Sequence, residues 1–357
     1  MMARLIQFEL RKNFSRRLTQ IFLLGLIFIS ILFMFSTYQN KYAFDGINRE
    51  GTGREAVEID KAIAKKYSGP LTDEKVGQML ADFYVESDIN AKYLYQNTIQ
   101  SAVCARFSDI DGNWNGLTVS DVFGNEKIKV GYVDGWLGVS QDMIKIIIFL
   151  SLVIIIMTAP VFSAEYGGVD HIILSSKYGK TKCAAAKIVA GFGAALIVTL
   201  GALAVNLLIA FWLYGNEGLD CSILFAPLLF TEGYIPFNIT CGTLLKYQCL
   251  LAVTGAISAA AMTLIFSALS KNQMAALAFS AAAYLFPVML PVAATHPLFR
   301  IIGLFPVYHA QFVSLMSVEQ IKGGLLYAIW AVPVTFALTA LSFVFSRKIF
   351  AKHQVSE

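Results

Sequence analysis

The stretch IIIFLSLVIIIMTAPVFSA, residues 146–164, contains no charged side chain. A run of about 20 apolar residues is long enough to cross the ~30 Å hydrocarbon core of a bilayer as a helix. A helix also satisfies its own backbone hydrogen bonds, which no irregular segment exposed to lipid can do. The stretch therefore predicts a membrane-spanning helix that ends just before Glu165.

Five other uncharged runs are comparably long, and they cover residues 18–40, 188–216, 247–270, 272–299 and 323–346. The 357 residues are 57% hydrophobic and 15% charged, whereas soluble domains carry ~25% charged residues. Mean hydropathy is +0.62. We expect an all-α polytopic membrane protein with six transmembrane helices: the first over residues 18–40, the second over 143–164, and four more within 184–346. The first is too long for a secretory signal and is expected to be an uncleaved anchor.

Lysine and arginine near the helix ends predict the orientation, because cytoplasmic loops carry an excess of both. With both termini inside, thirteen basic residues fall on the cytoplasmic side: Arg4, Arg11, Lys12, Arg16, Arg17, Lys177, Lys180, Lys182, Lys187, Lys271, Arg347, Lys348 and Lys352. The short outer loops hold three, namely Lys246, Arg300 and Lys322. We therefore expect a multi-pass protein of a bacterial cell membrane with both termini cytoplasmic, including the tail at residues 347–357.

Two segments flank the first span. Residues 1–17 form a basic amphipathic stretch, expected to be a cytoplasmic helix in the membrane interface; a topology anchor alone is the simpler interpretation. Residues 41–142 form an extracellular domain with 16 acidic and 11 basic residues. Thr72 can cap a helix, and we expect helices near 54–66, 73–86 and 89–106, with a hairpin within 127–138.

Two weaker patterns lie on the outer side. Asp111, Asn113 and Asn115 match the first half of a calcium-binding loop, but the twelfth position is valine and an ordinary polar turn explains the same residues. No Cys/His spacing typical of another metal site occurs. Cys221 and Cys241 bracket the loop between the third and fourth spans. A disulfide between them is possible in an oxidising compartment, and so are two reduced thiols.

The cytoplasmic loop at residues 165–183 is longer than a simple connection needs. It contains Gly-Lys-Thr at 179–181, but position 174 is leucine, so the first glycine of a phosphate-binding loop is missing. Gly167 and Gly168 break the chain after the second span. Residues 169–177 can form a short helix, with Asp170 near its N-terminus. Thr181 can then cap the third span.

The order of these parts resembles the permease subunits of ABC-2-type (type V) ABC exporters. The resemblance covers nearly the whole chain and is carried by FELRKNFSRR at 8–17, GPLTDEKV at 69–76 and AEYGGVDHIILSSKYGKTKCAAAKI at 164–188. Lys177 stands where the family often has proline. By this resemblance residues 165–183 are a coupling helix. Its expected ATPase-coupling residues are Glu165, Gly167, Gly168, Asp170, His171, Ser175 and Ser176, with Glu165, Asp170 and His171 as direct polar contacts and the glycines setting the turn.

The resemblance also implies partners. Two copies of a separate ABC ATPase subunit would hold ATP and Mg²⁺, and a second permease, identical or homologous, would complete the pathway for an amphipathic substrate such as a peptide, drug or lipid-like molecule. Membrane lipid is an expected partner and nucleic acid is not. This chain itself would bind no cofactor. Residues 301–318, which contain Pro306 and His309, would form a re-entrant or interfacial segment.

Two other functions remain open at this stage. A membrane enzyme, such as a CAAX-type protease or a lipid transferase, needs clustered catalytic groups. The four histidines, which are His171, His296, His309 and His353, are not paired with glutamate at a metalloprotease spacing. A non-transporting sensor or immunity protein could bind a cationic peptide on the acidic outer domain.

Overall fold

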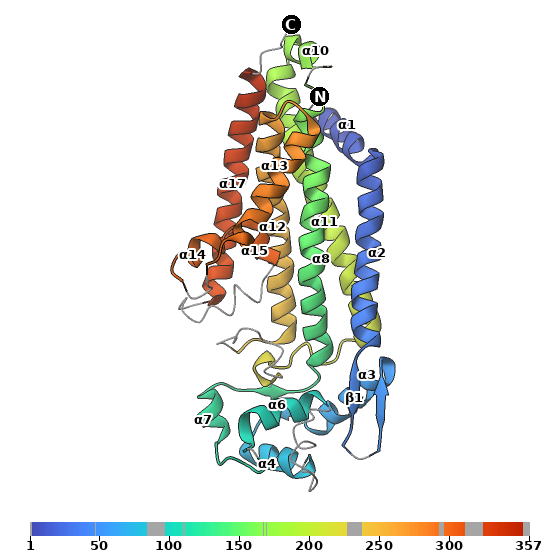
Figure 1. Ribbon diagram of the computed structural model, residues 1–357, viewed down its shortest axis with the longest axis vertical. Coiled ribbons are helices and arrows are strands. Elements are labelled where there is room, and N and C mark those ends of the chain that lie inside the picture. Colours follow the sequence, from blue (N-terminus) through green and yellow to red (C-terminus); the bar gives the residue numbers. More distant parts are fainter. Residues whose placement is uncertain are drawn as a thin grey trace.

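The computed structural model describes residues 2–46, 48–83, 97–109, 111–166, 168, 170–226, 238–292, 296–310 and 324–352. A bundle of long helices follows the long axis of the molecule (Figure 1). Helices α1 (Met2–Phe14) and α10 (Asp170–Ser175) lie at one end of it, with the last turns of α17 (Gly324–Lys352). We call this the terminus end. The small domain after the first long helix lies at the opposite end, which we call the domain end.

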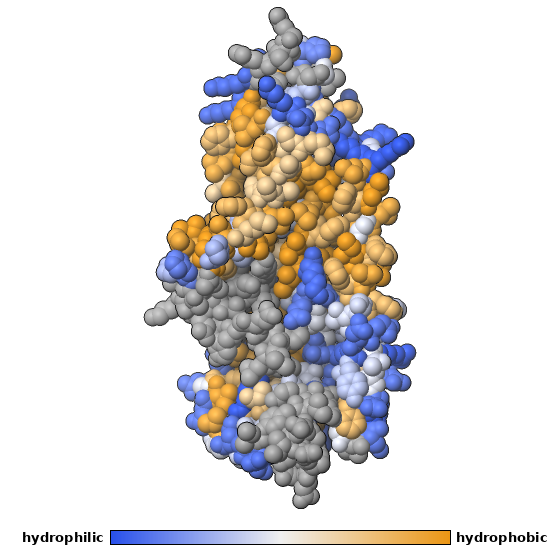
Figure 2. Space-filling model, in the orientation of Figure 1, coloured by the Kyte–Doolittle hydropathy of each residue, from blue (hydrophilic) through white to orange (hydrophobic). Residues whose placement is uncertain are grey.

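Five helices of the described residues are long and apolar enough to span a membrane. They are α2 (Arg17–Gln39), α8 (Asp134–Thr158) with its continuation α9 (Pro160–Ser163), α11 (Ala184–Tyr214), α12 (Cys241–Leu269) and α17. Figure 2 shows apolar side chains around the middle of the bundle and polar ones toward both ends. The all-α, polytopic membrane character predicted from the sequence is confirmed, with five candidate spans in place of six.

The helix predicted over residues 272–299 is shorter than expected. It consists of α13 (Gln273–Leu285) and a 3₁₀ turn, Phe286–Met289. Pro287 explains the end of the α-helical hydrogen bonding, because proline has no backbone N–H to donate to the preceding turn. In Figure 1, α13 runs beside α12 from the terminus end and stops before the domain end.

Two short helices follow, α14 (Phe299–Ile302) and α15 (Pro306–Ala310). Helix α15 packs against the middle of α12: a Cβ added to Gly255, the central residue of α12, would lie 3.0 Å from the Cβ of His309. The buried His309 ring also shares a hydrogen bond with Thr254 at 3.1 Å. Residues 306–310 thus lie halfway along α12, and the re-entrant or interfacial arrangement stays a prediction. The remainder of the predicted segment, 311–318, lies outside the described residues.

Helix α8 is the centre of the bundle and packs against α2, α11 and α12. It begins at Asp134, nine residues before the predicted start of the second span at 143. Helix α12 presents buried small residues, Ala252, Ala256, Ala259 and Ala260, to its neighbours. Small side chains let helices approach closely in lipid, and α12 and α17 are in extensive contact.

The domain combines short helices with two small antiparallel pairs. Strand β1 (Tyr42–Phe44) pairs with β2 (Glu50–Thr52), and β3 (Gly69–Pro70) pairs with β4 (Lys129–Val130). The described part of the domain also contains helices α3 (Arg54–Lys66), α4 (Asp73–Asp82), α6 (Thr98–Phe107) and α7 (Val119–Phe123). The expected helix 54–66 is confirmed, as is the cap at Thr72, whose side chain accepts from the N–H of Lys75.

One expectation for the domain needs correction. No hairpin occupies 127–138: β4 pairs with β3, far earlier in the chain, and α8 begins at Asp134. The half-matched calcium pattern forms a polar turn, in which Asp109 accepts from the N–H groups of Asp111 and Asn113, and Asn115 bonds the carbonyl of Arg106. Among the described residues, no group of three His, Cys, Asp or Glu side chains could hold a metal ion.

The predicted cysteine pair lies where the loop after α11 meets the start of α12. Ser222 and Thr240 form an antiparallel bridge, and the N–H of Cys241 donates to the carbonyl of Cys221 at 3.0 Å. Cα atoms opposite each other in such a pair are about 5.5 Å apart, a separation that disulfides commonly have. Both cysteines are free thiols in the structure, so the bond remains a prediction.

Candidate functional site at the terminus end

The site begins at a break in the central helix. Helix α8 ends at Thr158, and Pro160 starts α9. Because proline interrupts the helical hydrogen bonds, nearby N–H groups need other acceptors. The N–H groups of Phe162 and Ser163 donate to the hydroxyl oxygen of Ser267 on α12, at 2.9 and 3.3 Å. The end of α9 is therefore held by a neighbouring helix.

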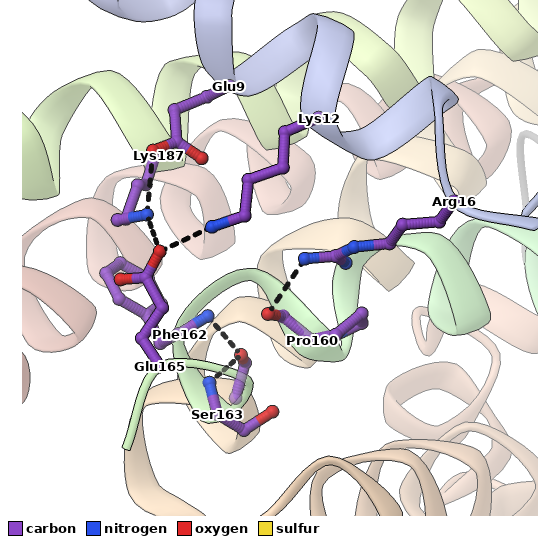
Figure 3. A network of polar contacts seen from close by, with 9 residues as sticks. Glu9, Lys12, Arg16, Pro160, Phe162, Ser163, Glu165 and Lys187 are labelled. Carbon is purple, nitrogen blue, oxygen red and sulfur yellow. Dashed lines mark hydrogen bonds and ion pairs between the residues drawn. The ribbon is translucent and has the colours of Figure 1, made fainter. Parts of the chain in front are cut away.

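Immediately after α9, Glu165 enters a buried ionic network (Figure 3). One carboxylate oxygen of Glu165 accepts from Lys12 on α1 at 2.6 Å and from Lys187 on α11 at 2.5 Å. Lys187 also pairs with Glu9 on α1 at 2.8 Å. The side chains of Glu165 and Lys187 are only 3% and 0% exposed. We call Glu9, Lys12, Glu165 and Lys187 the ionic network; its formal charges cancel.

Arg16 extends this arrangement toward the break. Its guanidinium donates to the carbonyl of Pro160 at 3.3 Å, as Figure 3 shows. Two buried atoms, the second carboxylate oxygen of Glu165 and one terminal nitrogen of Arg16, have no hydrogen-bond partner among the described residues. Burying charge is expensive unless it is paired. The network therefore depends on α1, α9 and α11 keeping their relative positions.

Aromatic contacts attach the same segment to the remaining helices. Phe350 on α17 lies 5.0 Å from Phe162 and 6.1 Å from Tyr166, measured between ring centroids. The hydroxyl of Tyr166 donates to the carbonyl of Ala268 at the end of α12, at 2.8 Å. Residues 160–166 are thus bound to α1, α11, α12 and α17 together.

The next residues form a surface segment, which we define as residues 168–183. Leu174 of α10 is its apolar anchor, 7% exposed and packed in a small core with Val161, Phe162 and Phe350. On the other side, Ile172 is 61% exposed. The exposed polar and basic residues of the segment are His171, Ser175, Ser176, Lys177, Lys180 and Lys182.

Gly179 explains the Gly-Lys-Thr pattern. Residues Gly179–Cys183 form one turn of π-helix that leads directly into α11. A Cβ at Gly179 would lie 1.6 Å from the carbonyl oxygen of Ile173, so no other residue fits without moving the turn. The pattern is therefore a helix boundary. The sequence suggested that Thr181 caps the third span. In the structure Thr181 lies within the π-turn and makes no cap.

Some of the predicted coupling residues are buried in this chain and others are exposed on the surface segment. Glu165 is buried inside this chain, so the structure gives it a positioning contact and not a surface to offer a partner. His171, Ser175 and Ser176 are exposed; the two serine hydroxyls donate back to Ile172 and Ile173 carbonyls. Gly168 lies in the exposed turn, Asp170 begins α10, and Gly167 is outside the described residues.

Sequence reasoning missed most of the ionic network. Glu9 and Asn13 of α1 are buried, so one polar stripe of this helix faces the bundle, whereas Arg4 and Arg11 are exposed. Phe8, on the side predicted to be apolar, is 64% exposed. The sequence does hint at this polar stripe, because Glu9, Lys12 and Arg16 recur at helical spacing. Lys187, the partner of Glu9, was not recognised because it was assigned to the cytoplasmic loop.

No family model, curated protein or solved structure matches this chain. Its function is therefore inferred from the residues and their geometry.

Proposed function

We propose that this chain is the transmembrane permease subunit of an ATP-driven exporter of the ABC-2 type, and that a separate ATPase docks on the surface segment. One observation carries the proposal. The surface segment is exposed, yet the residues next to it are fixed to four helices of the bundle by ion pairs, hydrogen bonds and ring contacts. A push on this segment would be transmitted to the spanning helices.

The chemistry of the segment suggests the surface that receives it. The surface segment carries the exposed Ile172 side chain and three exposed lysines, Lys177, Lys180 and Lys182. An apolar anchor inside a charged rim is typical of protein interfaces. The complementary ATPase surface would be an apolar pocket with an acidic edge. Two such ATPase subunits, holding ATP and Mg²⁺, and a second permease subunit complete the proposed exporter.

Loss of docking tests the proposal. The full chain, purified from its native membrane, should carry an ATPase activity with it. Ile172→Glu places a carboxylate in the proposed pocket and should remove at least about 90% of that activity, because burying an unpaired charge is costly. Leu117→Glu, an equally drastic change at an exposed apolar position of the domain, should leave the activity unchanged. A preparation without ATPase activity, or equal effects of the two changes, would refute the docking role.

A transport assay separates the exporter from the alternative function, a non-transporting sensor or immunity protein with an acidic peptide-binding domain. Sealed inside-out vesicles containing the chain and its ATPase should accumulate a fluorescent amphipathic probe when ATP is added. Binding of a cationic peptide to the domain without ATP-dependent accumulation of any probe would favour the sensor.

A further inference from the structure

The domain end of the bundle has a pocket between helices α2 and α11 and the first helix of the domain, α3. Its volume is about 490 Å³. The bundle contributes an aromatic floor: Phe35 and Tyr38 from the last turns of α2, and Trp212 from the last turn of α11. Trp212 is 77% exposed. Aromatic side chains gather at the level of lipid headgroups, where their apolar faces and polar edges are both satisfied.

The domain contributes a roof of mixed charge. Arg54 and Glu58 of α3 form an exposed pair at 2.9 Å, and their side chains are 83% and 53% exposed. Lys61, one turn further along the same face, lies 3.6 Å from Glu217. All of these except Glu217 line the pocket. Cationic and anionic groups therefore alternate above an aromatic floor.

Further toward the terminus end, the same two helices and Phe14 of α1 line an apolar groove of about 280 Å³. Helix α2 contributes residues at helical spacing, Leu23, Leu26, Ile27 and Ser30, and α11 contributes a face around Gly201. Helix α2 packs mainly on α8 and less on α11, which leaves this seam open. The bundle beneath the pocket is thus apolar and grooved, as a surface that accommodates acyl chains would be.

The geometry points to a binding site for a single phospholipid of the domain-side leaflet with a zwitterionic, amine-bearing headgroup. The phosphate would meet Arg54 and Lys61, and the ammonium would meet Glu58. A purely anionic headgroup would satisfy the cations and leave the carboxylate facing a like charge. This inference does not depend on an ATPase or on transport.

Native mass spectrometry of the full chain in detergent micelles tests the site. The probes are phosphatidylethanolamine and phosphatidylglycerol with identical oleoyl chains. We expect one phosphatidylethanolamine to be retained. It should bind at least about tenfold more tightly than phosphatidylglycerol, because its ammonium can donate a charge-assisted hydrogen bond to Glu58 and the glycerol headgroup has no such charge. Arg54→Gln combined with Glu58→Gln should abolish that preference.

The double variant has a matched control. Glu126→Gln combined with Lys127→Gln removes one exposed charge of each sign elsewhere in the domain and should leave the preference intact. Folding is preserved in both, because exposed pairs contribute little to stability. Trp212→Ala should weaken retention of phosphatidylethanolamine by about tenfold, whereas Trp330→Ala, which removes a similarly exposed tryptophan on α17, should not.

Three results would overturn the proposal. The first is no headgroup preference in the unaltered chain, and the second is an equal loss in the two double variants. The third concerns the source of the headgroup: soluble phosphoethanolamine binding as tightly as the lipid would make this a site for a small phosphoester and not for a membrane lipid.

Discussion

At the residue scale, the buried ionic network is the least expected feature. Lys187 is fully buried in a chain whose sequence placed it among loop lysines. The error has a physical origin: the uncharged run begins at residue 188, but α11 begins at Ala184 and its first turn lies against α1. Hydrophobic runs indicate which residues can face lipid. They do not indicate which charges a neighbouring segment will neutralise, because that depends on tertiary contacts.

A double-mutant comparison tests the network. Lys187→Met leaves Glu9 without a partner and Glu165 with Lys12 alone, and should lower the free energy of unfolding by about 3 kcal/mol or more. Adding Glu9→Gln removes the carboxylate that was left unpaired, so the double variant should be more stable than the single one. Thermal unfolding of the full chain in detergent measures both.

Lys180→Met is the control for that comparison. Lys180 is exposed, and changes at such positions usually alter stability by less than about 0.5 kcal/mol. Equal losses in the single and double variants, or a comparable loss in the control, would mean that the network does not contribute to stability as described.

At the scale of elements, apolar run length located the long helices well and their ends less well. The short α13 follows from Pro287, whose missing N–H could have been recognised in the sequence. The start of α8 at Asp134 could not have been recognised in the sequence, because it depends on tertiary contacts. The first turns of α8 bury Trp136 and Leu137 against the domain and the loop after α11. In the domain, helix 54–66 was found because its periodicity and charges agree locally. The pairing of β3 with β4 joins residues about 60 positions apart, and no local signal reveals it.

Gly179 provides an element-scale prediction. Gly179→Ala cannot be accommodated next to the carbonyl of Ile173, so the π-turn must shift and α10 must move with it. We expect the chain to fold but to lose most of the proposed ATPase association. Gly25→Ala on α2 is the control, because an added methyl group there meets no atom within 4 Å and lies outside the surface segment. Retained association in Gly179→Ala would show that the position of α10 is irrelevant.

The junction of α3 and α4 should respond to acid. Burial raises the pKa of Asp82, but hydrogen bonds from Lys66 at 2.7 Å and Tyr67 at 2.5 Å outweigh it, so the pKa is lowered overall. A carboxylate with a lowered pKa stabilises the folded state above its unfolded pKa, near 3.9, and loses this effect as pH falls through the folded value.

Asp82→Asn should therefore destabilise the domain at pH 7 by up to about 1 kcal/mol, since the pair is partly exposed. At a pH well below the folded pKa of Asp82, the variant and the unaltered chain should converge. Hydrogen exchange in α3 and α4 of the full chain, followed at both pH values, measures the difference. A difference that persists unchanged in acid would assign the effect of the substitution to packing.

At the scale of the whole molecule, the bundle of long helices separates two surfaces, one at each of its ends. The domain lies at one end of the bundle, and the surface segment, α1 and the end of α17 lie at the other (Figure 1). This separation, and the membrane character, could be predicted from composition, run length and basic residues. The re-entrant or interfacial arrangement of residues 301–318 stays a prediction. The structure shows that His309 closely approaches Gly255 in the middle of α12.

The most direct test of the proposed ATPase docking is cross-linking in intact cells. A photoreactive amino acid is placed at position 172 on the surface segment, and in a second variant at position 117 of the domain. The account predicts that light links position 172, and not position 117, to a nucleotide-binding subunit on the cytoplasmic side. An ATPase captured from position 117, or position 172 reacting only with lipid or with extracellular reagents, would contradict it.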